Sequence, residues 1–363
     1  MKAVVLWERG KPLAVEEVQI AKPREGEVLV RTAASGICHS DLHVIEGSLP
    51  MPPPCVLGHE PAGVVEEVGP GVTAFAPGDH VIGCLSAFCG VCELCLTGKP
   101  YLCSSGLDFG RGMEETPRLS CGDKPLFQMT NLSSFAEQML THERALVKIR
   151  DDMPLDRAAL IGCGVTTGLG AALNTAKVRP GQSAAVIGCG GVGLAALQGC
   201  RIAGASRIVA VDNQQWKLEL ALELGATDVI HSGEDDAVMK VLELTGGGVD
   251  NAFECIGLAS TVQQAVGMIR RGGTAVLVGV VPLGEMVGLH IADITLQEKR
   301  VMGSMMGSNR FRVDMPRYVD FYLDGRLKLD EMISSRIGLD GVNDAFEAMK
   351  KGEVARQVIC FDA

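Results

Sequence analysis

A glycine-rich turn at 188–193 follows an apolar run at 184–187 and opens a helical pattern that begins at Gly191. Gly188 permits the tight turn, and Gly193 allows the helix to pack closely against the preceding strand. Apolar runs and helical patterns then alternate as far as residue 278. This alternation predicts an α/β architecture with a doubly wound parallel sheet of the Rossmann type.

The same turn predicts a dinucleotide site. Gly190 lets the backbone approach a pyrophosphate, and the following helix turns the free N–H groups of its N-terminus toward that anion. The next apolar run ends at Asp212, about 20 residues beyond the glycines, where a carboxylate accepts hydrogen bonds from the adenosine ribose. Because a carboxylate repels a 2′-phosphate, Asp212 favours NAD over NADP as the cofactor.

The first part of the chain has a different pattern, with short alternating runs between Gly and Pro turns. Such runs predict a mostly antiparallel, partly barrel-like β domain. Its expected strands lie at 3–8, 13–20, 27–32, 63–68 and 79–82. The end of the chain is assigned back to this domain, through helical patterns at 318–323 and 342–350 and a last strand at 357–361. A chain of 363 residues also exceeds the usual size of one hydrophobic core, so two domains are expected.

Charge and hydropathy restrict the partners and the location. A formal net charge of -11 and a pI near 5.2 argue against nucleic acid and anionic membranes, whose binders present a basic face. We identify no apolar run long enough to span a bilayer, and the charge of Glu8 comes too early for a signal-peptide core. These features predict a cytoplasmic protein. In that reducing compartment, clustered cysteines among the 13 point to metal binding.

Four cysteines lie close together in one loop-rich segment: Cys89, Cys92, Cys95 and Cys103. Their thiolates are enough to close a tetrahedral zinc shell with no open position, which predicts a structural site. Taken alone, the same four-cysteine knuckle could equally mark a nucleic-acid or protein-binding module. The acidic charge balance weighs against that alternative.

A second set of ligands is dispersed along the sequence. Cys38, His59 and Cys163 can supply two thiolates and one imidazole, which leaves a fourth zinc position for water or substrate, as catalytic zinc requires. Asp41 would then accept a hydrogen bond from His59 and fix its tautomer. Glu60 would lie nearby as a carboxylate that helps ligand exchange.

The sequence resembles the zinc-dependent medium-chain alcohol dehydrogenase family, most specifically in the run GHEPAG at 58–63, continued by Gly69 and Val72. The resemblance covers essentially the whole chain. It implies a GroES-like catalytic domain at 1–164 and 305–363 and an NAD-binding Rossmann domain at 165–304. It also implies two zinc ions per chain: a catalytic ion on Cys38, His59 and Cys163, and a structural ion on Cys89, Cys92, Cys95 and Cys103.

The resemblance also assigns cofactor contacts. It implies that His39 and Arg356 contact the pyrophosphate and that Lys217 lies near the adenosine ribose. It implies that Thr167 and Val192 press on the nicotinamide ring. The predicted cofactor site further includes Val278 and Val280.

The spacing of Ser40 and His43 resembles the proton relay of the family. That relay would carry a proton from the substrate oxygen to the Ser40 hydroxyl, through the nicotinamide ribose, to His43 and solvent. The family's pocket positions fall on apolar residues: Leu49, Leu85, Leu107, Phe135, Val280 and Met305. Apolar walls predict reversible NAD-dependent oxidation of primary alcohols of the medium-chain, terpenoid or aromatic type.

Three alternative functions remain at this point. One is glutathione-dependent formaldehyde dehydrogenase, a relative that grips the charges of glutathione with an acidic and a basic residue, where this chain has Leu49 and Leu107. Another is a polyol or secondary-alcohol dehydrogenase, of which the polyol enzyme would need a polar pocket. The last is a non-enzymatic zinc-knuckle protein, which would need neither the open zinc site nor Asp212.

The segment 104–130 bears on the oligomeric state. It resembles an insertion that is present in dimeric members of the family and shortened in many tetrameric ones. We therefore expect a homodimer, with a tetramer as the alternative.

Overall fold

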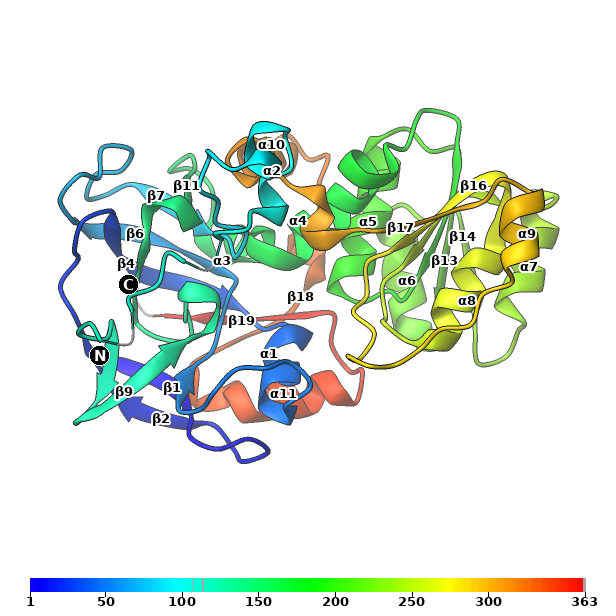
Figure 1. The fold of residues 1–363 in the computed structure, drawn as a ribbon. Coiled ribbons are helices and arrows are strands. Elements are labelled where there is room, and N and C mark those ends of the chain that lie inside the picture. Colours follow the sequence, from blue (N-terminus) through cyan, green and yellow to red (C-terminus); the bar gives the residue numbers. More distant parts are fainter. Residues whose placement is uncertain (107, 113, 362–363) are drawn as a thin grey trace. The chain divides into compact units, whose positions relative to one another are not determined.

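The computed structural model describes residues 1–106, 108–112 and 114–361 (Figure 1). The chain divides into two compact units. The first consists of Met1–Cys163, Arg310–Gly325 and Ile333–Ala363, and the second of Gly164–Asn309 and Arg326–Met332.

Two short segments cluster with the second unit, although the sequence assigned them to the first domain: residues 305–309 and 326–332. Residues 326–332 cluster with the second unit because two hydrogen bonds connect Lys328 to a buried side chain of that unit. The Gln198 side chain donates to the Lys328 carbonyl oxygen (3.0 Å) and accepts from the Lys328 N–H (2.8 Å). A contact across 130 residues of sequence leaves no pattern that would predict it.

The first unit contains short, mostly antiparallel strands. Its strands are β1 (Lys2–Leu6), β2 (Ala14–Glu17), β3 (Gln19–Ile20), β4 (Glu27–Gly36), β5 (Cys55–Val56), β6 (Pro61–Val68), β7 (His80–Gly83), β8 (Leu119–Cys121), β9 (Lys124–Gln128), β10 (Gln138–His142), β11 (Leu146–Lys148), β18 (Ile333–Ile337) and β19 (Arg356–Cys360). One sheet has the order β2-β1-β5-β9-β8-β3, and the other has the order β11-β7-β6-β4-β19-β18. The prediction of a mostly antiparallel, partly barrel-like domain is confirmed.

Strand β4 organises the second of these sheets. One of its edges pairs with β6 along most of its length, and its other edge pairs first with β10 and then with β19. Arg31, for example, lies opposite Gln138 on one side and Val64 on the other. The strand therefore extends to Gly36, four residues beyond the sequence-predicted end, because β19 returns from the end of the chain to pair with it.

Five helices belong to the first unit: α1 (His39–Glu46), α2 (Glu93–Leu96), α3 (Leu155–Leu160), α10 (Phe311–Leu323) and α11 (Val342–Lys350). These are the helices of this unit in the described ranges, and the shorter helical turns are η1 (Pro100–Leu102), η2 (Met129–Asn131), η3 (Glu143–Ala145) and η8 (Leu339–Gly341). Helix α1 buries Leu42 and Ile45, three residues apart, in one core cluster with Val342 and Phe346 of α11. This packing fixes the helix that follows Cys38.

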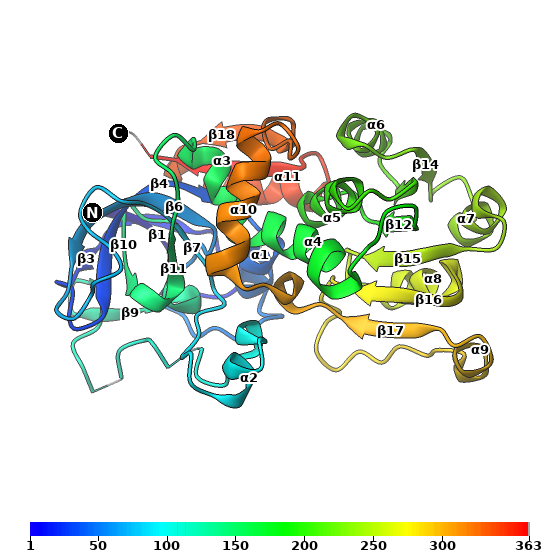
Figure 2. The ribbon, with the colours of Figure 1, turned by 90° about the horizontal axis from the view of Figure 1, so that it is seen from above.

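The second unit is a parallel sheet with the order β14-β13-β12-β15-β16-β17, and Figure 2 shows β15, β16 and β17 side by side. Its strands are β12 (Ser183–Ile187), β13 (Arg207–Asp212), β14 (Asp228–His231), β15 (Val249–Glu254), β16 (Ile269–Leu277) and β17 (Arg300–Gly303). Its helical segments are α4 (Thr166–Gly170), η5 (Ala171–Ala176), α5 (Gly191–Ile202), α6 (Gln215–Leu224), α7 (Ala237–Thr245), α8 (Ala259–Met268), α9 (Ile291–Leu296), η6 (Met305–Ser308) and η7 (Asp330–Met332). The predicted doubly wound Rossmann sheet is confirmed, and its strand order is that of dinucleotide-binding folds.

Successive side chains of the central strand β12 point to opposite faces of this sheet. Ala185 and Ile187 lie in a core cluster with Val241 of α7 and Val266 of α8. The intervening Val186 faces α5, because a Cβ added to Gly193 would lie 3.4 Å from its side chain. Helices therefore cover both faces, which leaves the carboxyl ends of the strands as the place for a ligand.

One helical run, Leu155–Ala176, is long and apolar enough to cross a membrane by length and composition. The expectation that the sequence contains no such run was therefore wrong. In this run α3 continues through η4 (Ile161–Val165) into α4 and η5. Since 89% of its most apolar window is buried inside the protein, the run is explained as a core helix.

Candidate active site

The buried Asp41 carboxylate joins two segments of the first unit. Its Oδ2 accepts a hydrogen bond from the Cys38 N–H (3.1 Å), and its Oδ1 accepts one from the Gly58 N–H (3.0 Å). The same Oδ1 lies 3.2 Å from His59 Nδ1, and both side chains are 0% exposed. With Nδ1 donating to Asp41, His59 keeps the lone pair of Nε2 available for a ligand.

The Nε2 atom of His59 is buried and has no hydrogen-bond partner among the residues that the structure describes. It lies in a cluster with Cys38, Glu60 and Cys163, whose ligand atoms are all within 4.8 Å of one another. An imidazole nitrogen between two sulfurs is a donor set typical of zinc, so the buried residues fit a zinc ion. The structure thus brings together the three ligands that the sequence predicted from separate segments.

The side chains of this cluster shift one another's pKa values. A hydrogen bond from Cys163 lowers the pKa of Cys38 well below that of a free thiol, and the same bond, together with burial, raises the pKa of Cys163. Burial alone would lower the pKa of His59, but the charge and the hydrogen bond of Asp41 raise it well above its usual value. An environment that stabilises positive charge at Nε2 also stabilises a metal cation there.

Glu60 forms a buried ion pair with Arg356. The Arg356 guanidinium donates to Glu60 Oε2, and the two side chains are 6% and 0% exposed. Burial raises the pKa of Glu60 to about 7, whereas the Arg356 charge opposes that increase. Gly36 is required at this point, because a Cβ there would collide with Glu60 Oε2 and lie 2.9 Å from the guanidinium. The sequence did not predict this pair, since its members are 296 residues apart and no local pattern joins them.

The predicted relay residues both lie on α1. Ser40 Oγ is 3.8 Å from Cys38 Sγ, and His43 is one turn further along the helix, at a spacing that places the two side chains on one face. Both side chains are half-buried, whereas His39 is exposed.

The predicted pocket residues of the first unit have different environments. Leu49 and Leu85 are half-buried, and Leu107 lies outside the described residues. Phe135 is 0% exposed, and a Cβ added to Gly58 would lie 2.5 Å from its ring. Phe135 therefore packs behind the Gly58–His59 segment and supports the turn that carries the histidine.

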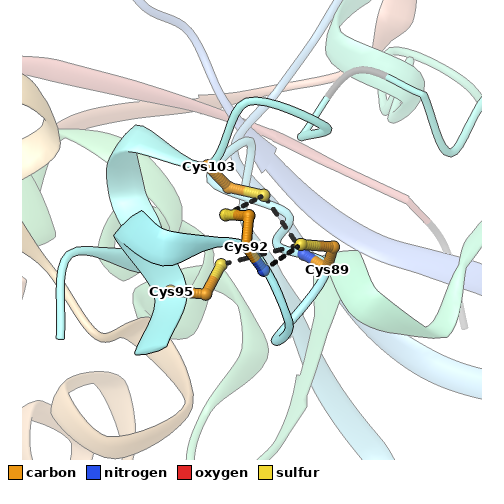
Figure 3. A group of neighbouring side chains, drawn as sticks. All are labelled: Cys89, Cys92, Cys95 and Cys103. Atoms are coloured by element: carbon orange, nitrogen blue, oxygen red, sulfur yellow. Dashed lines mark hydrogen bonds between the residues drawn. The ribbon is translucent and has the colours of Figure 1, made fainter. Parts of the chain in front are cut away.

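The four cysteines of the loop-rich segment form a separate cluster, which we call the cysteine lobe: Cys89, Cys92, Cys95 and Cys103. Figure 3 shows their sulfur atoms turned toward one another, with Cys92 preceding helix α2 and Cys95 lying within it. Two sulfur–sulfur distances are 3.9 Å, between Cys89 and Cys95 and between Cys92 and Cys103. A tetrahedral zinc–thiolate centre requires about 3.8 Å along each edge, so the lobe fits a closed zinc site.

Backbone N–H groups surround these sulfurs. Cys89 Sγ accepts from the Cys92 N–H (3.3 Å), and Cys103 Sγ accepts from the Cys89 N–H (3.2 Å). A backbone hydrogen bond from Cys95, opposed by desolvation, lowers the pKa of Cys92 to about 6. The thiolate form, which binds zinc, is thereby favoured at Cys92, whereas desolvation raises the pKa of Cys95 to about 12.

The glycine turn of the second unit has the geometry expected for a dinucleotide. Gly188 has a φ of +91°, which L-residues rarely adopt, and α5 begins three residues later. A Cβ added to Gly190 would meet no atom of the described chain within 4 Å, so the backbone is open on that side. The Asp212 carboxylate accepts from the N–H groups of Cys189 (2.7 Å) and Gln214 (3.0 Å) at the end of β13.

The other predicted cofactor residues of the second unit are placed as follows. Thr167 in α4 is 8% exposed and lies 3.4 Å from the sulfur of Met306, while Val192 opens the first turn of α5. Lys217 in α6 lies over the Trp216 ring at 5.5 Å. Val278 is nearly buried, whereas Val280 and Met305 are 58% and 51% exposed.

Comparison with known proteins then identifies the family. Residues 24–151 match the family described as alcohol dehydrogenase GroES-like domain, and residues 191–324 match that described as zinc-binding dehydrogenase. The chain is 40% identical over 365 residues to alcohol dehydrogenase class-3 of Myxine glutinosa, with 99% of this chain and 97% of the relative covered. The chain belongs to the zinc-dependent medium-chain alcohol dehydrogenase family. It is thus an oxidoreductase of that family.

Solved structures agree with this assignment. The dehydrogenase superposes on benzyl alcohol dehydrogenase from Acinetobacter calcoaceticus with a TM-score of 0.94 at 34% identity, covering 99% of each chain. A putative zinc-binding dehydrogenase from Sinorhizobium meliloti, bound to NADP, gives a TM-score of 0.84 at 30% identity, again with 99% of each chain covered. The resemblance seen in the sequence is confirmed by these matches.

The two clusters predict different consequences of losing a thiol. We expect purified enzyme to contain about two zinc ions per chain, since each cluster offers a complete set of ligands. Cys163→Ser should remove one zinc and abolish turnover with little loss of thermal stability. Cys95→Ser should chiefly lower the melting temperature, because closed zinc sites contribute folding free energy.

Metal analysis and thermal unfolding measure these effects, and Cys121→Ser is the matched control because Cys121 lies outside both clusters. The control should keep both zinc ions and the wild-type melting temperature. If Cys163→Ser and Cys95→Ser had the same effect on turnover and stability, the division into two kinds of site would be wrong.

Proposed function

We propose that this dehydrogenase reversibly oxidises primary alcohols to aldehydes with NAD. The buried His59 nitrogen beside two thiols is the main observation in support, because it offers a zinc ion three protein ligands and thus an open fourth position. When bound by Cys38, His59 and Cys163, zinc supplies Lewis acidity that favours ionisation of the alcohol. The cysteine lobe would hold the second, structural zinc.

The surrounding residues would prepare this site. Asp41 holds His59 in the tautomer that leaves Nε2 free, and it fixes the Cys38 segment with the same carboxylate. Glu60, buried beside the ligands and paired with Arg356, would assist ligand exchange. These contacts would hold the ligand side chains in place before a metal ion binds.

Proton removal would use α1. Ser40 Oγ lies near the Cys38 sulfur, and His43 is half-buried on the same helix face. We infer that Ser40 takes the alcohol proton and that His43 passes it to solvent. The separation of three residues suits such a path along one face of the helix.

NAD is proposed as the cofactor because of Asp212. Its carboxylate is 8% exposed and lies beside the glycine turn, where it can still accept from a ribose hydroxyl after binding two backbone N–H groups. One structural neighbour is bound to NADP, so family membership alone does not select the cofactor. In the proposed complex His39 and Arg356 contact the pyrophosphate, Lys217 the ribose, and Thr167 and Val192 the nicotinamide, with Val278 and Val280 nearby.

Medium-chain, terpenoid or aromatic alcohols are the proposed substrates. Leu49, Leu85 and Met305 offer apolar side chains, and the neighbour from Acinetobacter calcoaceticus is a benzyl alcohol dehydrogenase. By the family resemblance, Leu49 falls where a glutathione-using relative carries a charged residue. Buried charges of a glutathione adduct would lack partners there, which disfavours that substrate.

We further propose that the enzyme is a cytoplasmic homodimer. The insertion-like segment 104–130 supports a dimer. No disulfide joins the cysteines in the part of the chain that the structure describes, which suits a reducing compartment.

The cofactor proposal predicts a result for Asp212→Asn. This variant keeps an oxygen acceptor for the glycine turn but removes the charge that repels a 2′-phosphate, so the preference for NAD over NADP should fall roughly tenfold. Steady-state kcat/KM with both cofactors measures it. Asp228→Asn is the control. Asp228 is the first residue of the adjacent strand β14, whereas Asp212 pairs with the last residue of that strand, so the two carboxylates lie at opposite ends of β14. An unchanged preference in Asp212→Asn would remove Asp212 from the site.

The substrate proposal predicts a trend with chain length. Each buried methylene contributes about 0.8 kcal/mol, so kcat/KM should rise up to about fourfold per carbon while the chain fits. Octanol and benzyl alcohol should therefore exceed ethanol in kcat/KM with NAD. A panel that showed no rise with chain length, or more efficient use of the glutathione adduct of formaldehyde than of octanol, would overturn the proposal.

A further inference from the structure

Glu254, the last residue of β15, carries a buried carboxylate to which the function proposed above assigns no role. Its side chain is 0% exposed, and it lies at the carboxyl edge of the parallel sheet, one strand from the glycine turn. Ligands of such sheets bind outside this edge, where the strand order reverses. A charge buried at this position requires an explanation beyond packing.

The carboxylate holds the turn that follows β15. Its Oε1 accepts three hydrogen bonds of 2.8 Å, from the Ile256 N–H, the Gly257 N–H and the Thr261 hydroxyl. Charge-assisted bonds of this kind are shorter and stronger than neutral ones. They fix Gly257 at a φ of +90° and begin α8 at a defined position.

The same residue connects two neighbouring turns. Its backbone carbonyl accepts from the N–H groups of both Val278 and Gly279 (2.9 Å each), at the end of β16. The adjacent Cys255 N–H donates to the Ile187 carbonyl (2.9 Å), just before the glycine turn. Glu254 is thus bonded to one turn by its side chain and to another by its backbone.

Side-chain packing brings the turns still closer. A Cβ added to Gly188 would lie 2.5 Å from Ile256 Cγ1, so Ile256 packs directly over the glycine turn. A Cβ added to Gly257 would lie 2.5 Å from the Val280 carbonyl oxygen, which places the turn after β15 against the turn after β16. A shift of the Ile256–Gly257 segment would therefore disturb both the glycine turn and the turn after β16.

The second carboxylate oxygen is poorly stabilised. Glu254 Oε2 has no hydrogen-bond partner in the described ranges, and a Cβ added to Gly279 would lie 2.7 Å from it. An unpaired buried carboxylate oxygen costs stability, and a residue selected for stability alone would avoid it. Features that break local rules in this way concentrate at functional sites.

We propose that Glu254 is a positioning residue for the dinucleotide, which holds the Ile256–Gly257 segment between the glycine turn and the Val278–Val280 turn. The proposal rests on the proposed binding of NAD by this unit. Glu254 acts through the backbone N–H groups that it binds, and loss of its charge should loosen the segment against which the cofactor would pack.

The test compares Glu254→Gln with Asp250→Asn in the full-length enzyme. Asp250 is at the opposite end of β15, where its carboxylate accepts from the Ser183 N–H (2.8 Å) and pairs with Arg270. Both variants thus remove a charge from β15 that accepts a hydrogen bond from a backbone N–H. Glu254→Gln should weaken NADH binding roughly tenfold in a fluorescence titration and raise KM for NAD with little change in kcat, because a neutral amide binds the three donors less well.

Asp250→Asn should lower the melting temperature but leave NADH affinity unchanged. Equal weakening of NADH binding in both variants would reduce Glu254 to a purely structural role and overturn the proposal. So would wild-type affinity in Glu254→Gln. Failure of the wild-type enzyme itself to bind NADH would instead contradict the proposed function.

A second pair of variants covers the case in which Glu254→Gln does not fold. Thr261→Ser keeps the hydroxyl that donates to Glu254, whereas Thr261→Val removes it. NADH affinity should be retained in Thr261→Ser and reduced in Thr261→Val. Identical affinities in the two variants would overturn the proposal.

Discussion

The geometry of the metal-ligand cluster depends on the hydrogen bonds of one carboxylate, that of Asp41. It accepts from the Cys38 N–H, the Gly58 N–H and His59 Nδ1, and so joins the start of α1 to the segment that leads into β6. Two of the three proposed zinc ligands are positioned by these bonds. Because the group is fully buried, such donors are needed to stabilise its charge.

Buried carboxylates that bind backbone N–H groups recur in the second unit. Asp212 holds the glycine turn through the Cys189 N–H, and Glu254 holds the next turn through the N–H groups of Ile256 and Gly257. In each case a charge fixes an irregular segment at the carboxyl edge of the sheet, where regular strand pairing no longer restrains the backbone. Preorganisation of binding loops by buried charges is thus a common feature of both units.

Sequence patterns predicted the parts of the fold that depend on local or repeated signals. The strand, glycine turn and helix at 184–203 and the spacing to Asp212 were sufficient to predict the Rossmann sheet, and the cysteine spacing was sufficient to predict a four-thiol cluster. The approach of Cys38, His59 and Cys163 was predicted from ligand chemistry and from the family resemblance, since these residues lie far apart in the sequence. Their proximity in the structure supports the prediction, although their binding of zinc stays a proposal.

Long-range contacts could not be predicted in this way. The extension of β4 to Gly36 depends on β19, which returns from the other end of the chain, and the Glu60–Arg356 pair has the same origin. The start of β16 at Ile269 likewise depends on pairing with β15, because an apolar run followed by Arg270 and Arg271 suits a helix as well as a strand. Pairing with distant strands, rather than local propensity, determines the secondary structure of such segments.

We propose that each chain holds two chemically different zinc ions, one on four thiolates and one on two thiolates and an imidazole. Zinc K-edge X-ray absorption of the fully loaded enzyme tests it most directly, since sulfur ligands near 2.3 Å are distinguished from nitrogen or oxygen near 2.0–2.1 Å. Four sulfurs on one ion and two on the other average to three sulfurs per zinc, with about one nitrogen or oxygen ligand. The account predicts that mean. A mean of four sulfurs per zinc would show that only the cysteine lobe binds the metal and would contradict the account.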